Sequence, residues 1–210
     1  MKTPLLAPSL LSADFSSLEK AIKQIEDNKG SVVHIDVMDG QFVPEITYGQ
    51  PVVRSIRKLT KLPFDVHLMV EKPENQIKTF ADAGADWITF HMEAAVHAHR
   101  IIQQIHELGK KAGLSIVPST PLSSIKEILE YADIILVMTV NPGYGGQKLI
   151  PSCLKKVSEL KKLREENNYS YLISVDGGVN NDTLPLVKEA GADVIVSGSS
   201  FFNGSLKWDS

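Results

Sequence analysis

Short runs of apolar residues alternate along the chain with longer segments in which apolar residues recur at helical spacing. Runs of this length that are rich in valine, isoleucine and leucine predict buried β-strands. Their alternation with helical patterns indicates repeated βα units around a parallel sheet. We expect eight strands, over residues 4–8, 32–37, 64–70, 86–91, 113–117, 133–139, 171–175 and 193–197.

Eight such units in 210 residues predict an α/β fold of the (β/α)8 TIM barrel type, near the small end of its usual size range. No linker or shift in composition divides the chain, so we expect residues 1–210 to form a single domain. The residues that follow the last predicted strand are too few for a long closing helix. We therefore expect a short carboxyl-terminal tail over residues 198–210.

Composition and charge exclude several classes of function. A hydrophobic content of 43% and a net charge of -3 are typical of a globular protein and leave no basic excess for binding nucleic acid. No segment approaches the roughly 20 apolar residues that a membrane span requires. Residues 1–4 show no signal-peptide pattern, and the single cysteine, Cys153, suits a reducing compartment. We expect a cytoplasmic protein.

The second predicted strand is polar on one face and apolar on the other. Side chains along a strand alternate between its two faces, so His34, Asp36 and Met38 share a face and the residues between them are valine and isoleucine. Helices cover the outside of such a barrel, which requires an apolar outer face. We therefore expect His34 and Asp36 to point into the barrel.

The third and seventh strands repeat this alternation. Asp65, His67 and Met69 share one face of the third strand, and Ser174 shares one face of the seventh with Asp176. These polar residues lie towards the carboxyl ends of their strands, which is where this kind of barrel carries its active site.

Two imidazoles and two carboxylates are thus predicted to converge, from His34, Asp36, His67 and Asp176. This set suits one divalent metal ion, such as Zn2+, Fe2+, Mn2+ or Co2+, and two carboxylates balance the charge of a dication. Any single histidine here could instead be a hydrogen-bonded core residue. The four together are harder to explain that way, because a buried and uncompensated carboxylate pair is costly.

Three methionines, Met38, Met69 and Met138, lie at or near the ends of the second, third and sixth strands. They can be read as adaptable filling of the barrel. Alternatively, they form a methionine cushion that excludes water beside a planar, electron-rich intermediate.

Glycine-rich turns follow the sixth, seventh and eighth strands, over residues 141–147, 176–178 and 198–200. Glycines let backbone N–H groups approach an anion closely, and the loops after strands seven and eight are the usual phosphate seat of this barrel. The three turns predict a phosphorylated substrate. The loop over residues 143–147 could also close over that substrate as a lid.

Five segments together resemble the ribulose-phosphate 3-epimerase family. They are APSLLSAD (7–14), HIDVMDGQFVP (34–44), DVHLMV (65–70), NPGYGGQ (141–147) and VDGGV (175–179). The similarity runs from Ala7 to about Phe201. The resemblance implies a homo-oligomeric isomerase of the pentose phosphate pathway that interconverts D-ribulose 5-phosphate and D-xylulose 5-phosphate through an enediolate.

The resemblance also implies roles for individual residues. His34, Asp36, His67 and Asp176 would hold the metal, and Asp36 and Asp176 would also be the two catalytic acid/base groups. Met38, Met69 and Met138 would form the methionine cushion. The substrate would contact Ser9, His67, Gly143, Tyr144, Gly145, Gly146, Asp176, Gly177, Gly178, Gly198 and Ser199.

The chain departs from the family pattern at three positions. Val117 replaces a usual asparagine, Ser174 stands where glutamate is frequent, and Glu45 replaces a common asparagine. These changes leave the predicted ligands and acid/base groups intact. They bear on the tuning of the site and on sugar preference.

Three other functions compete with a pentose-phosphate epimerase. An epimerase acting on a six-carbon ketose phosphate, such as D-allulose 6-phosphate, stays open. A decarboxylase resembling the orotidine-phosphate enzymes would need lysine two residues after Asp36, where Met38 stands. A silent sugar-phosphate binding protein would have no use for both Asp36 and Asp176.

Overall fold

A computed structural model of the chain describes residues 3–208. Residues 1–2 and 209–210 of the predicted domain lie outside the described residues. Its centre is one sheet of parallel strands in the order β1-β8-β7-β6-β5-β4-β3-β2. The strands are β1 (Leu5–Pro8), β2 (Val33–Met38), β3 (Phe64–Met69), β4 (Trp87–His91), β5 (Lys111–Ile116), β6 (Ile134–Met138), β7 (Leu172–Asp176) and β8 (Val194–Ser197). The predicted TIM barrel is confirmed.

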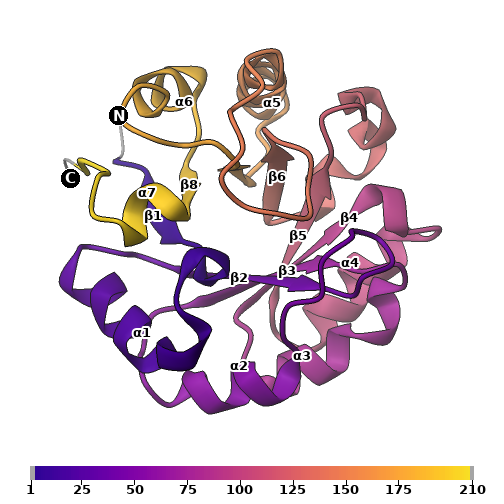
Figure 1. Ribbon diagram of the computed structural model, residues 1–210. Coiled ribbons are helices and arrows are strands. Elements are labelled where there is room, and N and C mark those ends of the chain that lie inside the picture. The colour runs from indigo at the N-terminus through magenta and orange to yellow at the C-terminus, as the bar shows by residue number, and fades with distance from the viewer. Residues whose placement is uncertain (1–2, 209–210) are drawn as a thin grey trace.

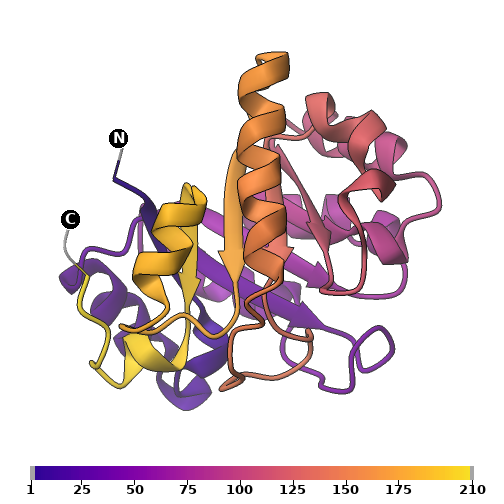
Figure 2. The same cartoon turned by 90° about the horizontal axis from the view of Figure 1, so that it is seen from above.

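Helices surround the strands on the outside (Figures 1 and 2). The α-helices are α1 (Leu18–Asp27), α2 (Gln50–Arg57), α3 (Ile77–Ala83), α4 (Ala98–Glu107), α5 (Cys153–Asn167), α6 (Leu184–Ala190) and α7 (Ser199–Phe202). Short 3-10 helices occupy the connections: η1 (Leu10–Ser12), η2 (Phe15–Ser17), η3 (Pro73–Asn75), η4 (Met92–Ala94), η5 (Leu122–Ser124) and η6 (Lys126–Tyr131). None of the described helices is long and apolar enough to cross a membrane.

The barrel closes between β1 and β2 with a stagger that sets the height of the site. Ser9, directly after β1, forms an isolated parallel bridge with His34, which is only the second residue of β2. The Leu6 carbonyl also accepts hydrogen bonds from the backbone of Ser31 and Val32. Because of this stagger, His34 lies level with the carboxyl end of β1 although it comes early in its own strand.

The two faces of each strand meet different surroundings, as the alternation predicts. Outward residues such as Val33 and Ile35 are fully buried in the layer between strands and helices. Inside the barrel, an apolar cluster that includes Trp87, Ile134 and Val194 packs together. The polar inner residues gather towards the carboxyl ends of the strands.

Two segments contain less helix than a full βα unit: the connection from β5 to β6 and the residues after β8. Only η5 and η6 link β5 to β6, because Pro118 and Pro121 interrupt the segment and leave few residues before β6 begins. The expected short tail is present as far as it is described: α7 has four residues, and Gly204 follows it with a φ of 74°. In α1, the Gln24 side chain donates to the Phe202 carbonyl and ties α7 to the barrel.

A glycine on β5 makes room for a polar side chain of β4. Gly113 pairs with Thr89 across the two strands, and a Cβ atom on Gly113 would lie 2.1 Å from the Thr89 Oγ1 atom. Thr89 is fully buried and donates a hydrogen bond to Asp65. The missing side chain at position 113 therefore lets a polar contact form inside the barrel.

Gly113→Ala should lower the free energy of unfolding by about 1–3 kcal/mol, because the added methyl group overpacks the Thr89 contact. Urea unfolding followed by circular dichroism measures the change. Gly49→Ala is the matched control, since its Cβ would meet no atom closer than 3.8 Å, and it should cost under about 1 kcal/mol. Equal stability of the two variants would contradict the tight contact.

Candidate functional site

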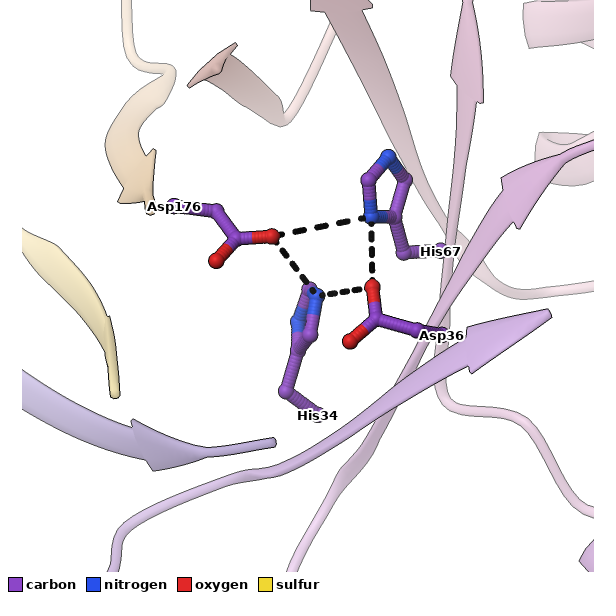
Figure 3. Close-up of side chains that lie close together, drawn as sticks. All are labelled: His34, Asp36, His67 and Asp176. Atoms are coloured by element: carbon purple, nitrogen blue, oxygen red, sulfur yellow. Dashed lines mark hydrogen bonds and ion pairs between the residues drawn. The ribbon is translucent and has the colours of Figure 1, made fainter. Parts of the chain in front are cut away.

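Four side chains from three strands point at one another at the mouth of the barrel (Figure 3). His34 and Asp36 come from β2, His67 from β3 and Asp176 from the end of β7. The His34 Nε2 atom lies 3.2 Å from Asp36 Oδ1 and 3.8 Å from Asp176 Oδ2, while the His67 Nδ1 atom lies 3.0 Å and 4.0 Å from the same two oxygens. One atom from each residue lies within 4.8 Å of all the others.

This donor set fits a divalent cation. Two nitrogens and two oxygens placed tetrahedrally at about 2.0–2.1 Å from an ion lie roughly 3.3 Å apart, and the four distances above bracket that value. The His34 Nε2 atom is completely buried and has no hydrogen-bond partner among the described residues. A buried nitrogen that has no hydrogen-bond partner and points at two carboxylates is expected of a metal ligand, because a bound ion would satisfy its lone pair. The cluster could therefore bind a metal ion.

A third aspartate orients the first histidine. The Nδ1 atom of His34 lies 2.8 Å from Asp65 Oδ2, and Thr89 donates to the other oxygen of Asp65 at 3.1 Å. Asp65 is only 1% exposed. A carboxylate can only accept, so it holds the His34 proton on Nδ1 and leaves Nε2 free to face the site.

Asp65 was predicted to point inward, but no role at the site was expected for it. The signal that could have shown this role is cross-strand pairing, because Asp65 is the direct register partner of His34. A staggered barrel places these partners side by side only once its register is known.

The two aspartates of the cluster have opposite pKa shifts in the metal-free chain. Burial raises the pKa of Asp36, but the charge of His34 and the hydrogen bond from His67 Nδ1 outweigh it and hold this pKa well below its usual range. Burial and the neighbouring charge of Asp36 raise the pKa of Asp176 to about 6. Burial lowers the pKa of His34, but the negative charges of Asp36 and Asp65 outweigh burial, so the pKa lies well above its usual value.

A cavity of about 230 Å³ lies over the cluster. Its wall contains nearly every residue that the sequence analysis assigned to the site; only His34 and His67 are absent from it, since they lie fully buried below. The assigned residues in the wall are Ser9, Asp36, Met38, Met69, Met138, Gly143, Tyr144, Gly145, Gly146, Asp176, Gly177, Gly178, Gly198 and Ser199.

Two further contacts shape this cavity. The Ser9 hydroxyl donates to Asp36 Oδ2, which fixes the carboxylate that also faces His67. In the loop between β6 and α5, residues 139–152, the Gln147 side chain donates to the carbonyls of Asn141 and Tyr144 and holds the turn together. Tyr144 at its tip is 56% exposed.

The three departures from the family pattern lie in different surroundings. Ser174 is buried two residues before Asp176, and its hydroxyl has no hydrogen-bond partner within residues 3–208. Val117 lies just past the end of β5 and donates its backbone N–H to Glu93. Glu45 is exposed and does not belong to the described wall of the cavity.

Known proteins resemble this chain over nearly its whole length. A family model described as "Ribulose-phosphate 3 epimerase family" matches residues 5–202. The ribulose-phosphate 3-epimerase of Treponema pallidum is 57% identical over 202 residues, covering 96% of this chain and 93% of that protein. That of Bacillus subtilis is 50% identical over 201 residues, covering 95% of this chain and 93% of the relative.

Among solved structures, a mutant tryptophan synthase alpha-subunit from Pyrococcus furiosus superposes with a TM-score of 0.72. The match covers 95% of this chain and 89% of that chain, at 16% sequence identity. At so low an identity the likeness concerns the barrel fold alone.

Metal affinity should depend on pH in two steps. Binding an ion must displace the proton of His34 across the neutral range, and below about pH 6 it must also displace that of Asp176, whose raised pKa keeps it protonated there. Each displaced proton weakens the apparent affinity about tenfold per pH unit. Zn2+ titration against a competing chelator, from about pH 5 to 8, measures this slope.

Asp176→Asn provides the control for that measurement. It removes the titrating carboxyl group, so the steeper slope below about pH 6 should disappear while the neutral-range slope remains. An affinity that does not change with pH would contradict the two pKa shifts.

Proposed function

This chain belongs to the ribulose-phosphate 3-epimerase family, and we propose that it interconverts D-ribulose 5-phosphate and D-xylulose 5-phosphate in the pentose phosphate pathway, using one divalent metal ion. The family makes it an isomerase. The observation that carries the finer proposal is the pairing of Asp36 with Asp176 at the floor of a cavity whose wall contains the glycine-rich loops.

The reaction inverts a carbon next to a ketone, so one group must remove the C3 proton and another must return a proton to the opposite face. Asp36 and Asp176 come from strands on different sides of the mouth and would serve one face each (Figure 3). Their opposite pKa shifts make Asp176 the easier of the two to protonate beside an ionised Asp36, which suits a pair that works as acid and base. In the reverse direction they exchange roles.

His34, Asp36, His67 and Asp176 would hold the metal ion, which would supply Lewis-acid stabilisation of the negative charge that develops on the substrate oxygens. Its identity among Zn2+, Fe2+, Mn2+ and Co2+ is not decided by two nitrogens and two carboxylates. The Ser9 hydroxyl, which donates to Asp36, would keep that carboxylate aimed at the substrate.

The methionine cushion, formed by Met38, Met69 and Met138, would keep water from the enediolate. All three side chains are at most 3% exposed and lie in the cavity wall. Apolar, polarisable thioethers offer no proton to a carbanion-like intermediate, so they favour return of the proton by an aspartate.

The phosphate of the substrate would lie against the turns after β7 and β8. Gly177 and Gly178 have φ values of 122° and 69°, and Gly178 approaches the Leu149 backbone so closely that a Cβ there would lie 2.2 Å from its nitrogen. Such turns expose backbone N–H groups to an anion, and Gly198 and Ser199 would add the start of α7. Gly143, Tyr144, Gly145 and Gly146 would close over the sugar.

The location and assembly of the protein stay predictions. A cytoplasmic homo-oligomer that binds neither nucleic acid nor membranes agrees with the composition and with the resemblance. The six-carbon alternative is separated from the pentose proposal by assay.

Asp36→Asn and Asp176→Asn should each lower epimerisation at least about 100-fold, because each removes one of two proton-transfer groups. A coupled assay under saturating metal measures turnover, and circular dichroism checks folding. In deuterium oxide, each variant should label C3 of at most one epimer. Asp82→Asn, which changes an exposed carboxylate paired with Lys78, is the matched control; near-normal turnover in either site variant would refute the two-base mechanism.

The purified protein should use D-ribulose 5-phosphate with a kcat/KM at least about tenfold above that for D-allulose 6-phosphate. The extra carbon must fit between the metal cluster and the phosphate seat, and one additional group typically changes discrimination by about 10–200-fold. Steady-state assays of both sugars measure this ratio. A preference for the six-carbon sugar would replace the pentose proposal by its alternative.

A further inference from the structure

A second histidine and a glutamate extend the site away from His67. The His67 Nε2 atom, on the side opposite the metal cluster, lies 2.9 Å from the Nε2 atom of His91 at the end of β4. The His91 Nδ1 atom lies 3.3 Å from an oxygen of Glu93 in η4. His91 is fully buried, and the ring of Phe42 packs over it with ring centroids 4.8 Å apart. The reaction proposed above uses neither His91 nor Glu93.

The facing nitrogens determine where the protons lie. Two imidazole nitrogens 2.9 Å apart can share only one proton, so one donates and the other accepts. A carboxylate can only accept, so Glu93 requires the proton of His91 to be on Nδ1. The Nε2 atom of His91 must then accept from His67. This places a proton on His67 Nε2 and leaves Nδ1 as the only ring nitrogen that can bind an ion. In the metal-free chain Nδ1 lies 3.0 Å from Asp36 Oδ1, and a proton shared there is the one that an ion would displace.

Glu93 is itself held in place from a neighbouring loop. Its other carboxylate oxygen accepts the Val117 backbone N–H at 2.8 Å and the Thr120 hydroxyl. The Lys156 ammonium group of α5 donates to the carbonyls of Val117, Pro118 and Thr120, at 3.1, 2.9 and 2.6 Å, and so fixes that loop. Any residue except proline can supply the N–H group at position 117, so valine in place of asparagine keeps this contact.

Glu93 carries a negative charge at neutral pH. Burial raises its pKa, but the hydrogen bonds from His91, Thr120 and Val117 outweigh burial and lower the pKa to about 2. It therefore remains a pure acceptor under the conditions in which the site works.

We propose that Glu93 is a positioning residue for the metal centre, acting through His91 to keep the His67 proton on Nε2 and its Nδ1 lone pair directed at the ion. The proposal rests on the metal site of the proposed function. It gives His67 through two hydrogen bonds what Asp65 gives His34 through one.

Glu93→Gln tests this sharply. Its amide oxygen can keep the bonds to Val117 and Thr120, while its NH2 group faces His91 and donates to Nδ1. The relay then reverses and His91 donates from Nε2. His67 can then hold its proton only on Nδ1, the atom that an ion needs. Affinity for Zn2+, measured against a competing chelator, should fall about 10–100-fold.

A spectroscopic measurement separates this role from a merely structural one. Nitrogen-15 spectra of the histidine rings in the metal-free protein, at about pH 8, should show His91 as the Nδ1–H tautomer in the wild type and as Nε2–H in Glu93→Gln. Thr120→Val removes one bond to Glu93 but keeps its charge, so it should leave the tautomer unchanged and the affinity within about threefold. Glu166→Gln, on an exposed glutamate paired with Lys162, should change neither quantity.

The outcomes are distinguishable. Unchanged Zn2+ affinity and an unchanged His91 tautomer in Glu93→Gln would overturn the proposal. Should that variant not fold, His91→Phe removes both ring nitrogens, and wild-type Zn2+ affinity in it would overturn the proposal equally. A wild-type protein that binds no Zn2+ would refute the metal site, whereas the tautomers would still decide whether the relay exists.

Discussion

The structure depends on the compensation of charge at one buried point. Asp36 and Asp176 approach each other at the floor of the cavity, with two fully buried imidazoles beside them; Asp36 is 2% exposed, and the Asp176 side chain is 17% exposed. Removing two carboxylates from water costs several kcal/mol each unless positive charge lies against them. In the metal-free chain the repulsion between these groups appears as opposite pKa shifts of the two aspartates, lowered for Asp36 and raised for Asp176. A bound dication would compensate both carboxylates and would be coordinated by one nitrogen of each histidine.

The barrel makes this cluster possible because it separates apolar from polar groups in two directions: between the two faces of each strand, and between the two ends of the barrel interior. Outward residues of the strands pack under the helices, and inward residues near the amino ends of the strands form an apolar cluster around Trp87. The polar side chains therefore have one region left to occupy, at the carboxyl ends, where the loops can reach them. The loop over residues 139–152 and the glycine turns after β7 and β8 then form the wall above the cluster. Rigid strands carry the ligands, and loops contact what enters.

Each histidine of the cluster is supported by a carboxylate on its far side. Asp65 contacts His34 directly, whereas Glu93 reaches His67 through His91. These supports come from β3 and η4, one step further round the barrel than the histidines they serve. Thr89 and the loop held by Lys156 in turn satisfy the outer oxygens of the two carboxylates. In the proposed arrangement, a second layer of residues that does not line this cavity determines the proton positions at the site.

The sequence by itself determined which side chains face inward, because strand alternation needs only local order, and it indicated His34, Asp36, His67 and Asp176 in that way. The succession of strand and helix patterns predicted the eight-strand barrel. Its motifs also indicated the family. Only the tertiary structure decided the stagger that raises His34 to the level of Ser9, the ring nitrogen that each histidine turns to the site, and the contacts of Asp65, His91 and Glu93. These depend on the register between strands and on side-chain rotamers, which residues far apart in the chain settle jointly.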